Sequence, residues 1–172
     1  MFGDKSRPFY KLCDTMRLER MSENDHALFI QKQAKIKWKK ALGSNVLELI
    51  FTLSEKHPYY LNLICNQAWL HDEFPTIEKI TLRWKNYIES EKTIFSSEIS
   101  GLSNNQKLLL LEVAKHPTKQ PFHNEYLKAA GLGIASQKQA LNKLLLLDFV
   151  FQNESGIFCV LDPAMRDYIV LS

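Results

Sequence analysis

The tetrapeptide His57-Pro58-Tyr59-Tyr60 is the most informative candidate for chemistry in this sequence. Pro58 suits the first turn of a helix, where the missing backbone N–H costs nothing. A helix start offers unpaired N–H groups and a positive dipole end to an anion, and a proline ring or a tyrosine face can lie against an adenine ring. Two interpretations are open: a nucleotide contact through His57, Pro58 and Tyr59, or a helix start with a buried aromatic pair.

A second candidate is the segment 137–143, which has the composition of a DNA recognition helix. Two lysines are few for that role, and the turn of the following hairpin carries Glu154 with no basic residue. Since phosphate neutralisation supplies most non-specific affinity, we expect weak DNA binding at most and favour a protein-facing or intramolecular surface. The side chains that can reach base edges and phosphates are Gln137, Lys138, Gln139, Asn142 and Lys143.

The run Leu144-Leu145-Leu146-Leu147-Asp148 imitates a Walker B strand, but we predict that it ends a helix. A Walker B acid holds the magnesium of a nucleotide that a Walker A loop binds. None of the six glycines is followed by lysine, so the chain lacks a Walker A loop. We therefore expect no ATP hydrolysis by this chain alone.

No other group of residues indicates catalysis or metal binding. The histidines lack an HxxxH spacing, and the three cysteines, Cys13, Cys65 and Cys159, lie far apart without a CxxC pair. We expect reduced thiols in a cytoplasmic protein and no metal site. The lysines between positions 32 and 40 spread over more than one helix face, which favours a solvated surface over a nucleic-acid site.

Composition limits the class of protein further. The chain has 172 residues, of which 45% are hydrophobic and 24% charged, as in folded proteins. The net charge of +3 is a mild excess for a nucleic-acid binder. No apolar run approaches the roughly 18 residues that span a bilayer, and the first residues do not resemble a signal peptide. We expect no membrane partner.

The first half predicts four short helices. Ser22 caps a helix that runs to about Ala41, and Gly43 separates it from a second helix capped by Ser44 or Asn45. A third helix follows Pro58 to about residue 70, and a fourth opens at Pro75 and continues to about residue 89. Short connections between four helices favour a compact antiparallel bundle.

The pattern changes after Ser96-Ser97, and we place a boundary between two cores near residues 92–100. Helices are predicted at about 103–115, at 124–130 and, capped by Ser136, at 137–146. Apolar stretches at 149–152 and 157–161 flank a turn and predict a β-hairpin, and a last helix spans 164–170. Three helices and a hairpin in this order are typical of a winged helix-turn-helix with a two-stranded wing.

Together these features resemble the C-terminal part of the AAA+/STAND-type P-loop ATPases, often called archaeal-type ATPases. The resemblance covers essentially the whole chain. It implies a mainly α fold, with a helical lid-type domain at residues 1–95 and a winged-helix domain at 96–172. The motifs that carry it are Arg7-Pro8-Phe9-Tyr10, His57-Pro58-Tyr59-Tyr60, the winged-helix order and Asp162-Pro163-Ala164-Met165-Arg166-Asp167-Tyr168.

The nucleotide-binding half of that family is absent from this sequence, so the resemblance implies a C-terminal piece of a longer ATPase. ATP or ADP would be bound in the full-length protein, with His57, Pro58 and Tyr59 along the adenine, and this chain alone would carry no cofactor. Its partners would be the missing P-loop core or another protein. The alternative is a winged-helix transcriptional regulator with an N-terminal helical effector or dimerisation domain.

Overall fold

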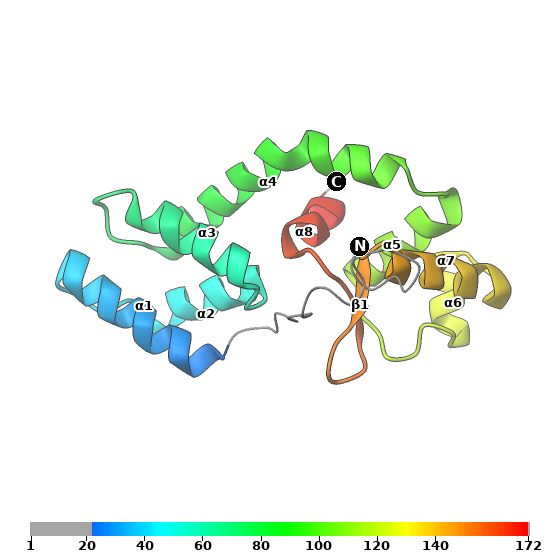
Figure 1. Cartoon of the computed structure of the whole chain (residues 1–172), viewed down its shortest axis with the longest axis horizontal. Helices are drawn as coiled ribbons and strands as arrows, with labels where there is room; N and C mark the ends of the chain where they lie inside the picture. Colours follow the sequence, from blue (N-terminus) through cyan, green and yellow to red (C-terminus); the bar gives the residue numbers. More distant parts are fainter. Residues whose placement is uncertain (1–21, 172) are drawn as a thin grey trace, which may run out of the picture.

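The protein is mainly helical, with one small antiparallel sheet, in the computed structural model, which describes residues 22–171. This confirms the fold class at the level of helices plus one hairpin. Figure 1 shows two groups of elements joined along the long helix α4. The elements are α1 (Glu23–Trp38), α2 (Ser44–Ser54), α3 (Pro58–Trp69), α4 (Ile77–Ser100), α5 (Asn104–Lys115), α6 (Asn124–Ala130), α7 (Ile134–Leu146), β1 (Val150–Gln152), β2 (Phe158–Val160) and α8 (Pro163–Leu171).

Local sequence signals set most of the helix ends. Pro58 is the first residue of α3, as predicted. Ser103 and Gln106 form a reciprocal capping box at the start of α5, which satisfies two backbone N–H groups. Gly131 ends α6 in the left-handed region, at φ 66°, where a side chain would be strained. The predicted cap of α2, Ser44 or Asn45, is one or two residues late, since Gly43 holds that position.

The predicted end of the fourth helix is wrong, because α4 continues through Ser96-Ser97 instead of ending near residue 89. Its buried side chains, Ile80, Trp84, Ile88 and Phe95, keep helical spacing across the expected linker. Phe95 is buried in a hydrophobic cluster with side chains of α1 to α3, and this packing keeps the turn around Ser96-Ser97 helical. The predicted linker rested only on the polar residues of the exposed face of this helix, and that prediction of a helix end is wrong.

Helix α7 also begins earlier than predicted. It starts at Ile134 with Gly133 as its cap, so Ser136 lies inside the first turn instead of capping it. The hairpin that follows has the predicted turn, and Val150 pairs with Val160 in an antiparallel register. A single bridge between Thr118 and Phe158 attaches the loop after α5 to the second strand. The run 144–146 is helical, as expected for a false Walker B match.

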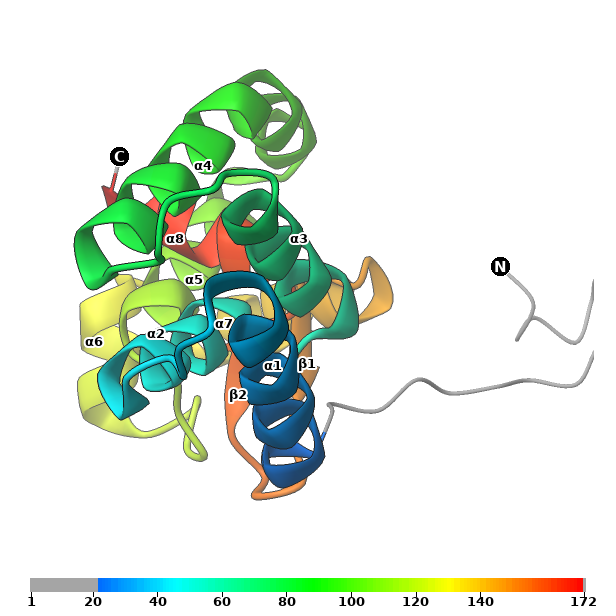
Figure 2. The ribbon, with the colours of Figure 1, turned by 90° about the vertical axis from the view of Figure 1, so that its left-hand side faces the viewer.

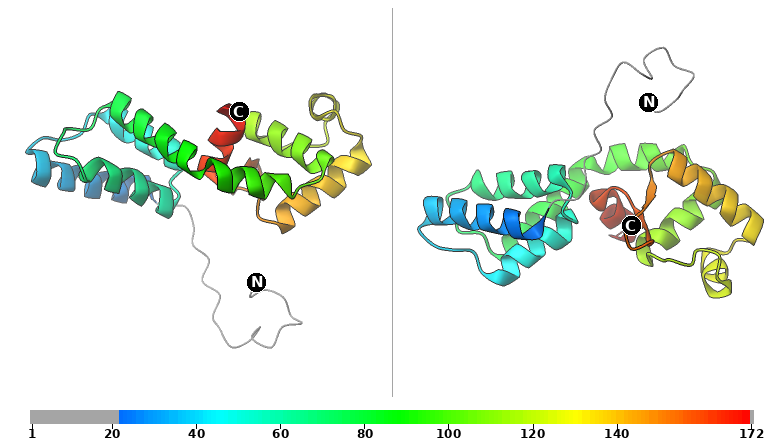
Figure 3. Two further views of the ribbon diagram at one scale, coloured as in Figure 1. Left: turned by 90° about the horizontal axis from the view of Figure 1, so that it is seen from above. Right: turned by 60° about the horizontal axis from the view of Figure 1, so that its bottom comes forward.

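Two hydrophobic clusters share helix α8. The first cluster joins α1–α4 with Ala164 and Met165 of α8, and the second joins α5, α7 and both strands. Ile99, Phe149 and Ile169 pack against both clusters. Figure 3 shows α8 between the N-terminal helices and the hairpin, and in Figure 2, seen from the N-terminal bundle, α8 lies behind α3. The proposed division into residues 1–95 and 96–172 stays a prediction, and α8 contributes to both cores.

No helix in the described part of the chain is long and apolar enough to cross a bilayer. The 7–10 segment and Cys13 lie outside the described residues.

The continuity of α4 can be tested with Ser97→Pro. Proline removes a backbone hydrogen bond and clashes with the preceding turn, so we expect the free energy of unfolding to fall by about 3 kcal/mol or more. Ser97→Ala is the matched control and should stay within about 0.5 kcal/mol of the parent. Urea denaturation followed by circular dichroism measures both variants. Equal stabilities would indicate a linker at this point.

Candidate functional site

The His57-Pro58-Tyr59-Tyr60 motif starts α3 in the geometry that its sequence predicts. His57 is the cap residue, and its Nδ1 accepts a hydrogen bond from the Tyr59 backbone N–H at 3.2 Å. Pro58 follows in the first turn. Tyr59 is 56% exposed, whereas Tyr60 is buried at 5%. Only Tyr60 of the expected buried pair lies in the core, and the nucleotide contact through His57, Pro58 and Tyr59 stays a prediction.

Tyr60 lies at the centre of an aromatic group. Its ring is 5.0 Å from that of Tyr59, 5.4 Å from that of His57 and 5.6 Å from that of Trp84. Trp84 in turn stacks on Tyr87 at 5.8 Å between ring centroids. These contacts fix the start of α3 against the middle of α4. The exposed Tyr59 ring is consequently presented from a rigid base.

The Tyr60 hydroxyl joins the His57-Pro58-Tyr59-Tyr60 motif to the Asp162-Pro163 motif at the start of α8. It donates to Asp162 Oδ2 at 2.6 Å, across 102 positions of sequence. The other carboxylate oxygen, Oδ1, accepts from the backbone N–H groups of Ala164 and Met165 at 2.8 and 2.9 Å, so Asp162 caps α8. Burial and the adjacent Asp162 carboxylate raise the pKa of Tyr60, which keeps the hydroxyl protonated as a donor.

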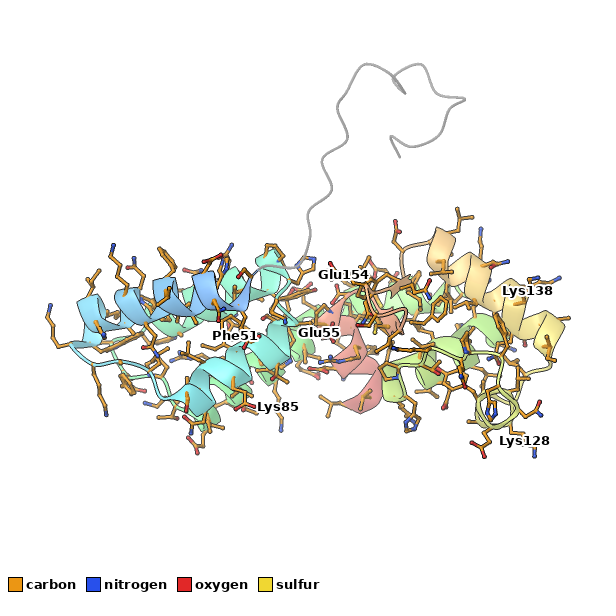
Figure 4. The ribbon with its side chains drawn as sticks, turned by 90° about the horizontal axis from the view of Figure 1, so that it is seen from below. Phe51, Glu55, Lys85, Lys128, Lys138 and Glu154 are labelled. Carbon is orange, nitrogen blue, oxygen red and sulfur yellow. The ribbon has the colours of Figure 1, made fainter. Side chains whose placement is uncertain are left out.

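A second polar contact lies one turn further along α8. Arg166 pairs with Glu55, in the turn between α2 and α3, and with Asp167 Oδ1 at 2.7 Å. Asp167 Oδ2 also accepts from the Trp84 indole N–H at 2.8 Å. Figure 4 shows Glu55 at the end of the N-terminal bundle that faces α8. We call these contacts and the Tyr60–Asp162 hydrogen bond the α8 joint.

A cleft of about 450 Å³ opens beside the α8 joint. It lies between the start of α3, the last turns of α4, the turn that follows α7 and the start of α8. Its lining is apolar with an acidic part, and no lysine or arginine is among the residues that line it. Those residues are His57, Tyr59, Tyr60, Glu98, Leu147, Asp148, Phe149, Leu161, Asp162 and Met165.

Sequence reasoning found only one wall of this cleft. His57 and Tyr59 line it, whereas Pro58 is not among its lining residues. The 147–149 turn and Glu98 come from elements whose positions depend on tertiary packing. The Asp162-Pro163 start of α8 is a recognisable motif, but its contact with Tyr60 leaves no signal in the sequence.

The predicted DNA-binding residues on α7 divide into two groups. Gln137 is fully buried, and its Nε2 donates to the Pro121 carbonyl, so the prediction that it reaches DNA is wrong. This side chain faces the loop before α6. Lys138, Asn142 and Lys143 are exposed on α7. Figure 4 shows Lys138 near the end of the molecule remote from the N-terminal bundle.

Comparison of the chain with protein-family models, curated proteins and solved structures finds no match in any of the three. Among residues 22–171 there is no group of three or more His, Cys, Asp and Glu side chains placed to hold a metal ion.

The Tyr60–Asp162 hydrogen bond should contribute measurably to stability. Tyr60→Phe leaves a half-buried carboxylate with one partner fewer, so we expect the free energy of unfolding to fall by about 1–2 kcal/mol. At this chain length each kcal/mol corresponds to about 2–4 °C in melting temperature. Thermal and urea unfolding measure the loss.

Tyr126→Phe is the matched control. The Tyr126 hydroxyl donates to the uncharged backbone carbonyl of His116 at 3.2 Å, in an exposed setting. Its effect should be the smaller of the two. In a double-mutant cycle with Asp162→Asn, the effects of Tyr60→Phe and Asp162→Asn should not add. Additive effects would show that the two side chains do not interact.

Proposed function

We propose that this chain is the lid and winged-helix module of an AAA+/STAND-type P-loop ATPase, with the cleft at the α8 joint facing the nucleotide. The observation that carries the proposal is the meeting of two resemblance motifs at one site. The start of α3 and the start of α8 touch through Tyr60 and Asp162 and form adjoining walls of the cleft. A site that reports nucleotide binding needs such a contact between the two parts.

The arrangement of elements supports both halves of this assignment. Helices α1 to α3 share one hydrophobic cluster with α4, from Ile80 to Phe95, as a lid bundle would. Helices α5, α6 and α7 precede a two-stranded hairpin, in the order of a winged helix. Helix α8 then returns to the bundle, and this gives the winged helix a direct contact with the lid.

The chemistry of the cleft fits the base and ribose of a nucleotide better than its phosphates. The rings of Tyr59 and Phe149 offer apolar surface to an adenine. Asp148 and Glu98 are exposed acceptors suited to ribose hydroxyls. Because the lining residues include no lysine or arginine, the phosphates would be held by the P-loop core. The chain alone should therefore bind nucleotide weakly and hydrolyse none.

The proposed role is that of a nucleotide-state sensor. A nucleotide can shift a two-state equilibrium only through contacts that differ between the states. Closure of the cleft on a base would move the 147–149 turn and the start of α8 together. The winged helix would report that movement to the ATPase core or to a protein partner.

The nucleotide proposal can be tested by titrating the ¹⁵N-labelled chain with adenosine, ADP and ATP and following amide shifts by NMR. We expect perturbations at residues 57–60 and 147–149 and similar dissociation constants, about 1 mM, for all three ligands. ATP turnover should not exceed a buffer blank. Tyr59→Ala should remove the shifts, whereas Phe122→Ala, another exposed aromatic residue at 42% exposure, should retain them.

Two outcomes would contradict the proposal. One is the absence of any perturbation at the cleft at about 10 mM adenosine, which is well above the expected dissociation constant. The other is ATP binding that is much tighter than adenosine binding and centred elsewhere, since that would require a phosphate site. The gene offers a separate check: an upstream open frame encoding Gly-x-x-x-x-Gly-Lys-Ser/Thr would support the ATPase assignment.

The exposed face of α7 favours a second candidate function, a winged-helix DNA-binding regulator. Lys138, Asn142 and Lys143 all face solvent. Opposing this, Gln137 is buried, and the hairpin turn carries the exposed Glu154. Two phosphate contacts predict a slope of about −2 for log affinity against log salt, and little affinity.

The DNA candidate can be tested by fluorescence anisotropy on random duplexes and on the gene's own promoter. We expect weak, salt-sensitive and sequence-indifferent binding, reduced by Lys138→Glu with Lys143→Glu. Lys85→Glu with Lys92→Glu is the matched control on exposed positions of α4 and should bind like the parent. Nanomolar binding to one duplex at physiological salt, lost only in the α7 variant, would establish the regulator and displace the sensor proposal.

A further inference from the structure

The cleft beside the α8 joint has apolar walls and an excess of negative charge. Glu98, near the end of α4, and Asp148, in the 147–149 turn, both line it and are exposed. Neither of these two carboxylates makes a hydrogen bond or an ion pair with any residue between positions 22 and 171. Asp162 adds a third carboxylate to the same lining.

The cations close to the cleft in sequence are paired with other carboxylates. Lys56 Nζ lies 3.5 Å from Glu23 Oε2, and Arg166 pairs with Glu55 and Asp167. The lining itself contains no lysine or arginine. A concave site lined by charges of one sign concentrates the opposite charge. The cleft is therefore electrostatically complementary to a cation.

The apolar walls indicate which cation fits. The rings of Tyr59 and Phe149 offer faces on which a guanidinium group can stack, and Leu161 and Met165 offer aliphatic surface to a methylene stem. A guanidinium group also donates to a carboxylate through two parallel hydrogen bonds. An ammonium group is a compact and more strongly hydrated charge that stacks less well. Aromatic faces beside unpaired carboxylates thus favour arginine over lysine.

We infer that this cleft is a docking site for an arginine side chain of a protein partner. Glu98 and Asp148 would accept its hydrogen bonds, and the Tyr59 and Phe149 rings would cover its plane. The inference follows from the charge and lining of the cleft and does not rest on the nucleotide proposal. Because a ribose would use the same two carboxylates, the arginine of the partner and a nucleoside would compete for the cleft.

Titration of the ¹⁵N-labelled full chain with N-acetyl-arginine amide at constant ionic strength tests the site, with amide shifts followed by NMR. We expect shifts at residues 57–60, 98 and 147–149 and a dissociation constant of about 5 mM. N-acetyl-citrulline amide has nearly the same shape without the charge, and it should bind at least about tenfold more weakly. N-acetyl-lysine amide should lie between the two.

Glu98→Gln with Asp148→Asn removes both charges at nearly constant shape. Asparagine tolerates the positive φ of 59° at position 148, so the turn should keep its conformation. This double variant should bind the arginine derivative about tenfold more weakly than the parent. Glu48→Gln with Glu125→Gln is the matched control, because both residues are exposed and lie outside the lining, and it should bind like the parent. Thermal melts establish that each variant is folded.

Three results would overturn the inference. They are no shifts at the cleft at about 50 mM N-acetyl-arginine amide, equal binding of the citrulline derivative, and equal losses of affinity in the two charge variants. Shifts that appear only after Arg7, Arg17 and Arg20 are changed to glutamine would identify the first segment of this chain as the occupant, and would also overturn it.

The adenosine titration separates this inference from the nucleotide proposal. Adenosine shifts without arginine shifts would overturn the arginine site and leave the nucleotide proposal intact. Arginine shifts without adenosine shifts would support the arginine site and remove the nucleotide proposal.

Discussion

The Asp162 carboxylate holds the two halves of this molecule together. One of its oxygens caps α8 through two backbone N–H groups, and the other accepts the Tyr60 hydroxyl from the N-terminal bundle. A helix cap contributes about 1 kcal/mol, and a hydrogen bond to a charged acceptor about 1.5–3 kcal/mol. Because one side chain makes both interactions, the direction in which α8 leaves the hairpin is coupled to the position of α3.

Arg166 and Asp167 reinforce this constraint one turn later. Isolated surface ion pairs contribute little to stability, but the Arg166 and Asp167 side chains are only 23% and 20% exposed. Arg166 also pairs with Glu55, and Asp167 also accepts from the Trp84 indole N–H. Met165, on the same helix, is buried in the first hydrophobic cluster, while Ile169 packs against both clusters. Polar and apolar contacts of α8 thus specify the same orientation. The cleft owes its shape to that agreement, since its walls come from both halves.

The sequence predicted elements well where the signal is local. Pro58 starts a helix because it needs no N–H donor there, and Gly131 ends one because it accepts a positive φ. The predictions failed where packing outweighs local preference. Ser96-Ser97 is typical of a linker, yet buried Phe95 keeps it helical. Gln137 has the chemistry of a base contact, yet it is buried and donates to the Pro121 carbonyl.

The site was predictable only in part, for a related reason. His57 and Tyr59 belong to a recognisable helix start, but Asp148, Glu98 and Asp162 reach the cleft through contacts between distant segments.

The continuity of α4 limits how the cleft can change shape. With no break at Ser96-Ser97, the two halves cannot swing about that point. A change in the cleft must instead pass through α8 and the 147–149 turn, where Asp148 already has a positive φ of 59°. A non-glycine residue in the left-handed region stores strain of order 1 kcal/mol. Among the elements that line the cleft, the 147–149 turn is therefore the one whose backbone would release strain in a rearrangement.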